Sequence, residues 1–124
     1  MRIVKVQQMS SVLDKLSKSK FRSSFHLNKK MINYTNEKGL EKIREDAYDL
    51  ITKRLAPAYP KNDGKQTPMK QVHPVFIAQH ACACCCRSCL EKWHHINKGQ
   101  ELNQDEIDYI VNLLMEWIKK ECKV

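Results

Sequence analysis

The residues of this chain that could do chemistry are concentrated in one stretch, residues 73–95, with the sequence HPVFIAQHACACCCRSCLEKWHH. The stretch holds five of the six cysteines and four of the five histidines of the 124-residue chain. Cysteine thiolates and histidine imidazoles are ligands of zinc, and neighbouring thiols can also form a redox pair or supply a nucleophile. The composition therefore predicts a metal site here, with reactive thiols and ordinary buried cysteines as the two alternatives.

The spacing of these residues indicates which of them could bind one ion. Two residues separate Cys86 from Cys89, and four more precede His94, which gives the first three ligand spacings of a zinc knuckle. The fourth position of that pattern is Gly99, which has no side-chain donor, so the remaining ligand comes from elsewhere or the position stays open to water. A closed site is typical of structural zinc, and an open position is typical of catalytic zinc. The candidates for the remaining ligand are Cys85, His80 and His73.

We expect residues 76–93 to form one helix that carries these side chains. At about 100° per residue, one face of that helix would gather most of the thiols. Its members would be Cys82, Cys85, Cys86, Cys89 and Trp93. Cys82 and Cys89 would lie about 10 Å apart along the axis, whereas a zinc–sulfur bond is about 2.3 Å long. At most two or three of these cysteines can therefore share one ion.

Length and charge predict a single small domain with an anionic partner. A chain of 124 residues suits one domain with a modest core, which a metal ion would help to stabilise. The net charge of +8 is unevenly distributed, at +6 over residues 1–37, +3 over residues 38–72 and −1 over residues 73–124. A basic first half favours a polyanion such as nucleic acid, and a solvated lysine-rich segment without a specific partner is the alternative.

The sequence shows no secretory signal and no apolar run long enough to cross a membrane. We therefore expect a cytoplasmic protein that does not enter a membrane. In a reducing cytosol, clustered cysteines are more often metal ligands or catalytic groups than disulfides.

The remaining segments predict an all-α fold, a bundle of three to four helices. Residues 1–25 are basic and rich in serine, and we expect them to form a mobile arm or a weak helix. Residues 26–124 are expected to form a single helical domain. Asn28 and Gly39 are suited to cap the two ends of a helix over residues 29–38.

Two further helices are predicted from apolar residues that recur at helical spacing. The first covers residues 40–55, and the second follows Asn103, which forms a capping pair with Glu106. Their apolar faces are expected to form the core.

Residues 56–74 are predicted to be a long loop, because four prolines and Gly64 interrupt any continuous helix. Within it, Gly64, Lys65 and Thr67 bring backbone N–H groups, an ammonium and a hydroxyl close together, so they are candidates for binding a phosphate or another anion. The motif is not a Walker A loop, since the first glycine is absent. We expect the loop to pack on the cysteine-rich helix, where Arg87 would join the anion site.

Two motifs, LAPAYPKNDGKQTPM at residues 55–69 and HPVFIAQHACACCCRSCLEKWHHI at residues 73–96, resemble a family of small bacterial and phage proteins. That family is catalogued as a domain of unknown function, and the resemblance extends over roughly residues 20–120. Relatives usually carry threonine at the positions of Cys82 and Cys84. The resemblance therefore implies the ligand set Cys85, Cys86, Cys89 and His94. It implies no activity.

Taken together, these observations predict a metal-stabilised domain that binds nucleic acid, a nucleotide or another phosphate-bearing ligand. Zinc is the expected metal, ahead of an iron–sulfur cluster, on Cys85, Cys86, Cys89 and His94. One alternative is a metal- or cysteine-dependent enzyme acting on an anionic substrate, in which His73 or His80 is the general base. The other is a factor that engages a protein partner and whose metal is only structural.

Overall fold

The computed structural model describes residues 6–123, with side chains from residue 11 onward. This part of the chain contains six α-helices, one short 3₁₀-helix and no strand, which confirms the predicted all-α class. Its elements are α1 (Val6–Ser17), η1 (Arg22–Ser24), α2 (Lys29–Lys38), α3 (Leu40–Arg54), α4 (Pro74–Ala81), α5 (Arg87–His94) and α6 (Gln104–Cys122). The helix count exceeds the predicted three to four.

Three helices begin or end where the sequence placed their caps. The Asn28 side chain accepts a hydrogen bond from the backbone N–H of Met31 at 2.9 Å and starts α2. Gly39 separates α2 from α3 with φ of 88°, a conformation that side chains with a Cβ rarely adopt. Asn103 and Glu106 form a reciprocal capping box at the start of α6.

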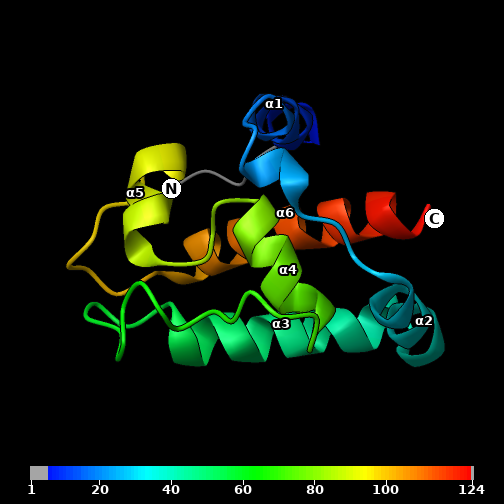
Figure 1. The fold of residues 1–124 in the computed structure, drawn as a ribbon. Helices are drawn as coiled ribbons and strands as arrows, with labels where there is room; N and C mark the ends of the chain where they lie inside the picture. The colour runs from blue at the N-terminus through cyan, green and yellow to red at the C-terminus, as the bar shows by residue number, and fades with distance from the viewer. Residues whose placement is uncertain (1–5, 124) are drawn as a thin grey trace.

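The core lies between α3 and α6, with α4 at its centre (Figure 1). The stripe predicted on α3 is fully buried at Ile43, Ala47 and Ile51. All eight residues of α4 are buried, as expected for a helix that is apolar around most of its circumference. In Figure 1, α3 lies below α4, α6 passes behind it, and α5 lies at the left. The described residues include no helix long and apolar enough to cross a membrane.

The prediction of one helix over residues 76–93 is wrong, because the chain breaks between α4 and α5. Ala83 has φ of 59°, which no α-helix can contain. The break is fixed by two hydrogen bonds between Gln79 and Cys84: the Cys84 N–H donates to the Gln79 carbonyl at 2.7 Å, and the Gln79 amide donates back to the Cys84 carbonyl at 3.1 Å. Cys82 and Cys84 are fully buried in the core instead of lying on an open helix face.

The segment expected to be a mobile arm or a weak helix is helical over α1. Its first five residues lie outside the described part of the chain. Leu13 and Leu16 are buried in the core, and α1 contacts α6. The 3₁₀-helix that follows packs against α4, so this segment reaches the cysteine-rich region.

The loop before α4 has no helix, as predicted, and it packs on the corner between α4 and α5. The Thr67 hydroxyl donates to the Cys85 carbonyl at 2.8 Å. The Gln79 amide contacts the same hydroxyl at 3.3 Å, and the His80 ring nitrogen Nε2 lies 3.0 Å from the Thr67 carbonyl. These buried contacts fix the backbone that carries the thiols.

Candidate metal centre

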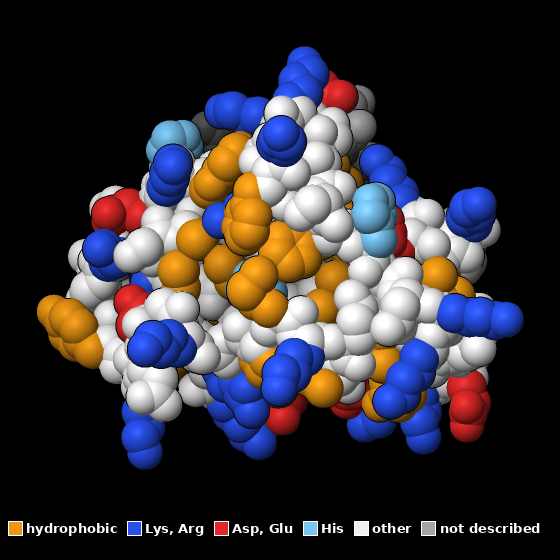
Figure 2. Space-filling view, in the orientation of Figure 1, with side chains coloured by type: hydrophobic (Ala, Val, Ile, Leu, Met, Phe, Trp, Pro, Cys, Tyr) orange, Lys and Arg blue, Asp and Glu red, His pale blue; other side chains and the backbone are white. Residues whose placement is uncertain are grey.

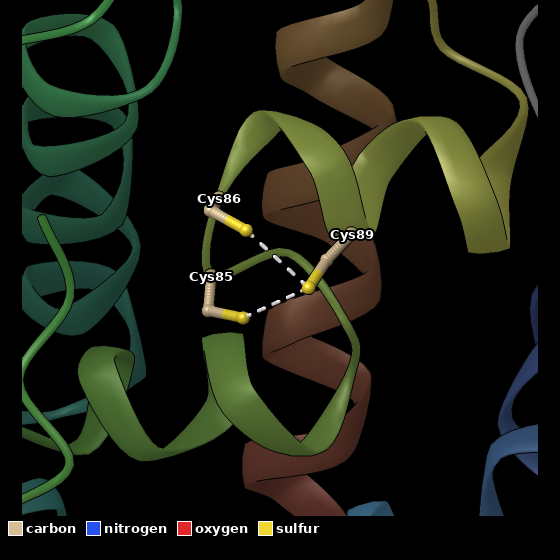
Figure 3. A group of neighbouring side chains, drawn as sticks. All are labelled: Cys85, Cys86 and Cys89. Atoms are coloured by element: carbon tan, nitrogen blue, oxygen red, sulfur yellow. Dashed lines mark hydrogen bonds between the residues drawn. The ribbon is translucent and has the colours of Figure 1, made fainter. Parts of the chain in front are cut away.

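Three cysteine side chains converge at the α4–α5 corner (Figure 3). Cys85 and Cys86 belong to the segment between the helices, and Cys89 lies in the first turns of α5. The Cys89 sulfur is 3.5 Å from that of Cys85 and 3.4 Å from that of Cys86. All three sulfurs lie within 4.8 Å of one another. All three cysteines follow the break at Ala83, within the five residues 85–89 at the start of α5.

The spacing of the sulfurs suits a single metal ion. Sulfurs bound at about 2.3 Å to one tetrahedral zinc lie roughly 3.8 Å apart, close to the separations found here. The group Cys85, Cys86 and Cys89 could thus hold a metal ion. Iron–sulfur clusters usually take four cysteine ligands, one more than the described residues gather at this point.

A buried arginine completes the surroundings of the three thiols. Arg22, from η1, is 8% exposed, and its guanidinium donates to the His80 carbonyl at 2.7 Å. It also donates to the sulfur of Cys89 at 3.1 Å and to that of Cys85 at 3.6 Å. Among the described residues, no carboxylate forms an ion pair with this guanidinium within 4.0 Å. The sulfurs of Cys85 and Cys89 are therefore the groups in contact with this guanidinium that can carry a negative charge.

These contacts shift the acidity of the thiols in opposite directions. A hydrogen bond from Cys89, with the Arg22 guanidinium nearby, lowers the pKa of Cys85 to about 7 despite its burial. The same contact with Cys85, together with burial, raises the pKa of Cys89. Burial opposes protonated Arg22, but its hydrogen bonds to the two thiols outweigh that effect and raise its pKa. The site therefore favours a negative charge shared between Cys85 and Cys89.

His94, the expected fourth ligand, lies apart from this group. Its Nε2 is 2.8 Å from the Cys82 carbonyl and 3.6 Å from the Cys84 sulfur, and its Nδ1 is 2.7 Å from the Tyr109 hydroxyl. Both ring nitrogens therefore have partners within the core. Burial lowers the pKa of His94 and raises that of Cys84. The second cluster, made of His94, Cys84 and Tyr109, is therefore uncharged at neutral pH.

The two candidate general bases have different environments. His73 caps α4, where its Nδ1 accepts from the Val75 N–H at 3.1 Å and its Nε2 lies 3.0 Å from an Asp46 oxygen. Neither nitrogen is free to take a proton from a substrate. His80 is buried against Phe25, with ring centroids 5.3 Å apart, and its burial lowers its pKa. Since its Nε2 faces the Thr67 carbonyl, the neutral ring carries its lone pair on Nδ1.

The structure does not bring the four expected anion-binding residues together. The Gly64 N–H donates to the Gln66 side chain at 2.7 Å, and the Thr67 hydroxyl is engaged by the Cys85 carbonyl. Arg87 is 1% exposed, and its guanidinium donates to four main-chain carbonyls. Those carbonyls belong to Leu55, Pro57, Asn97 and Gln100. Of the expected set, Gly64 and Lys65 are exposed, and Lys65 alone lines a hollow in the surface.

Lys65 instead lines a basic hollow with three other cations. The hollow measures about 410 Å³ and contains no aspartate or glutamate. The residues that line this basic hollow are Lys53, Arg54, Lys61, Asn62, Lys65, Gln66 and Pro68. The hollow lies between the end of α3 and the loop before α4.

The chain matches a family described as a domain of unknown function, DUF4186, over residues 10–119. It belongs to the DUF4186 family. This confirms the family resemblance, and the matched region includes Arg22, the three cysteines and the basic hollow. No solved structure matches the chain.

The sequence of this DUF4186 protein did not reveal Arg22 as a partner of the thiols. Its contacts with Cys85 and Cys89 join residues 63 and 67 positions apart, so no local pattern carries them. The available signal was an arginine between Phe21 and Phe25, since the other basic residues over 11–25 are lysines. Arginine is the cation that tolerates burial best, because it is weakly hydrated and offers five N–H donors.

Proposed function

We propose that this protein is a small metal-stabilised domain that binds nucleic acid or another phosphate-bearing ligand. The metal, zinc in our proposal, is held by Cys85, Cys86 and Cys89. The basic hollow provides the anion-binding surface. The observation that carries the binding role is the gathering of Lys53, Arg54, Lys61 and Lys65 around one hollow, of which Lys53 also pairs with Asp49 at 3.0 Å.

The metal would stabilise the domain by joining segments that have few other constraints. Cys85 and Cys86 lie between α4 and α5 and Cys89 lies in α5, so one ion would fix the segment that leads into α5 against that helix. A metal that binds only the folded chain adds its binding free energy to that of folding. Through Arg22, the same ion would also hold the N-terminal segment.

The hollow has the charge and shape that a phosphate group requires. Four cations surround a concave surface, and amide side chains of Asn62 and Gln66 lie among them. Figure 2 shows further lysine and arginine side chains around the edge of one face of the molecule, with a few acidic side chains among them. A surface rich in cations attracts polyanions and makes their binding sensitive to salt.

The metal part is tested by elemental analysis of the purified chain. We expect one zinc per chain in the wild type, and loss of zinc together with helical circular dichroism in Cys86→Ser/Cys89→Ser. Cys122→Ser, which removes a thiol outside the group, is the matched control and should keep its zinc. A metal-free wild-type protein whose thiols all titrate freely would refute this part.

The binding part is tested by fluorescence anisotropy with a labelled DNA duplex at several salt concentrations. We expect Lys61→Ala/Lys65→Ala to weaken binding and to reduce the slope of log affinity against log salt by up to about 2. Lys92→Ala/Lys123→Ala removes the same charge from exposed positions outside the hollow and should have a smaller effect. No binding of DNA, RNA or nucleotide at low salt would sink the proposal.

A second candidate, a metal-dependent enzyme acting on an anionic substrate, is favoured by the count of three converging ligands. Three protein ligands with one open position are typical of catalytic zinc. His80 would be the general base through its Nδ1 lone pair. Activity on a phosphate ester that is lost in His80→Ala, with the zinc content unchanged, would favour this candidate over the binding domain.

A further inference from the structure

We infer that the metal on Cys85, Cys86 and Cys89 binds one small anion from solution at its fourth coordination position. The inference rests on the proposed metal site, and it identifies the kind of ligand that this site takes. It follows from three features of the structure: the side chains near the sulfurs, the exposure of the sulfurs, and the unused donors of Arg22.

No fourth side chain of the described residues is in place to complete a tetrahedral site. The group of ligand atoms within 4.8 Å of one another contains only the three sulfurs. An Asp63 carboxylate oxygen accepts from the backbone N–H of Arg87, the residue after Cys86, at 3.3 Å, and the same oxygen also accepts from the Gln66 amide at 3.0 Å. Residues 1–10 contain no cysteine, histidine, aspartate or glutamate.

The histidines nearby are occupied by other contacts. His94 has partners for both ring nitrogens in the second cluster, on Tyr109 and on the Cys82 carbonyl. His80 is held by the Thr67 carbonyl and by its stacking on Phe25. His94 would have to give up buried contacts to reach the metal, which costs about 1–3 kcal/mol for each polar group left unpaired. Neither ring nitrogen of His80 lies within 4.8 Å of all three sulfurs.

A small ligand can reach the sulfurs from solution. Cys86 and Cys89 are partly exposed, unlike Cys82 and Cys84, which are fully buried. Phe21, which stacks beside Arg22, is itself 53% exposed. Figure 2 shows hydrophobic side chains gathered near the centre of one face of the molecule, with most of the charged side chains around them. No bulky charged group of the described residues forms an ion pair with Arg22 that would cover the site.

The donors of Arg22 favour an anion over a neutral ligand. Three thiolates around a divalent metal carry a charge of −1, which the guanidinium offsets, so an anion meets less repulsion there than it would without Arg22. Of the five N–H donors of Arg22, three are used by His80, Cys85 and Cys89. The guanidinium lies 3.1 and 3.6 Å from two of the sulfurs, and its remaining two donors are available to a metal-bound anion. Such charge-assisted hydrogen bonds are stronger than neutral ones.

Cobalt(II) substitution tests this inference, because the visible absorption of tetrahedral cobalt depends on all four ligands. Thiocyanate is the probe, and perchlorate, which coordinates metals poorly, is the control at equal ionic strength. We expect thiocyanate to change the spectrum saturably, with one thiocyanate per cobalt, and perchlorate to have no effect. Arg22→Gln should bind thiocyanate roughly tenfold more weakly while retaining one cobalt, and Arg22→Lys should recover part of the loss.

The outcomes separate this inference from the proposed metal site. If cobalt binds one per chain and depends on Cys89, but thiocyanate leaves its spectrum unchanged, the fourth position is filled by the protein and the inference is overturned. A spectral change in His80→Phe or Asp63→Asn without any anion would then identify the filling side chain. If no cobalt binds, the metal proposal fails and the inference fails with it.

Discussion

Two buried arginines flank the thiol group, and they are held in different ways. Arg22 and Arg87 are 8% and 1% exposed, and they are the only buried lysines or arginines of the described side chains. Arg87 donates to carbonyls on both sides of the α4–α5 region. Arg22 donates to one carbonyl and to the sulfurs of Cys85 and Cys89.

The two arginines differ in whether the charge of their hydrogen-bond partners can change. Main-chain carbonyls keep their dipoles at every pH and in every metal state, so the surroundings of Arg87 are constant. Thiols can be protonated, ionised or bound to metal, and a buried guanidinium is stable only where nearby negative charge offsets its lost hydration. Arg87 is therefore a constraint on the fold, whereas the contribution of Arg22 depends on the state of the centre.

The largest effect is expected from removing Arg87. Arg87→Met leaves four carbonyls without their donor and should destabilise the protein by about 3–5 kcal/mol. Because these partners do not involve the thiols, the loss in the free energy of unfolding should be the same with and without a chelator. Urea unfolding followed by circular dichroism measures both. A loss of stability that disappears when metal is removed would show that Arg87, like Arg22, depends on the state of the metal centre.

A smaller, conditional effect is expected from Arg22. Arg22→Gln should destabilise the metal-loaded protein by about 1–3 kcal/mol, the value of hydrogen bonds to charged groups. In the chelated protein at pH 6, where the thiols are protonated, the same substitution should cost less. Lys20→Gln removes an exposed charge from the same segment and serves as the control. Equal losses in both metal states would mean that Arg22 is another structural arginine.

His94 extends the comparison to a partly buried histidine in the same region. Its neighbours are a phenol, a carbonyl and a neutral thiol, so no anion in contact with it stabilises a positive charge. Burial accordingly lowers its pKa. The unfolded chain therefore takes up a proton at higher pH than the folded one. The stability that His94 contributes is complete above the unfolded pKa near 6.5 and falls as the pH decreases through the folded pKa.

His94→Gln should therefore flatten the dependence of stability on pH between about 7.5 and 5. At pH 7.5 the variant should lose about 1–2 kcal/mol through its weaker hydrogen bonds. Thermal unfolding at several pH values shows both effects. His95→Gln, at the exposed neighbouring position, should change the pH dependence much less, since His95 affects His94 only through its charge. A wild-type stability that rises on acidification would show that His94 is charged and paired, contrary to this structure.

The sequence predicted the helices whose ends are set by local contacts, and it failed where distant contacts decide. Asn28 and Asn103 cap helices through residues three positions away, so their signals can be read directly. The break at Ala83 has no glycine or proline to mark it, and it exists because Gln79 and the loop before α4 hold the backbone there. Arg22 reaches the thiols only through the tertiary fold. Three of the four expected metal ligands converge, because Cys85, Cys86 and Cys89 all follow the break and keep their spacing of three and four residues.

The smallest effect on stability is expected from Arg54, an exposed arginine that lines the basic hollow. Its guanidinium lies 5.1 Å from the centre of the Phe76 ring and donates to the Gln66 carbonyl at 3.2 Å. A cation–π contact at an exposed site contributes only about 0.5–1 kcal/mol. Arg54→Met should therefore lower stability by less than about 1 kcal/mol, since the methionine can still cover the ring.

The same variant should weaken binding of a DNA duplex more than it weakens folding, because Arg54 faces the hollow while Arg22 and Arg87 face the interior. Anisotropy titrations and urea unfolding on one preparation compare the two losses. Arg22→Gln, measured alongside, should show the opposite order, with a larger change in stability than in DNA affinity. If Arg54→Met alters stability as much as Arg22→Gln and leaves DNA affinity unchanged, the hollow is a structural feature and the anion-binding role moves to another surface.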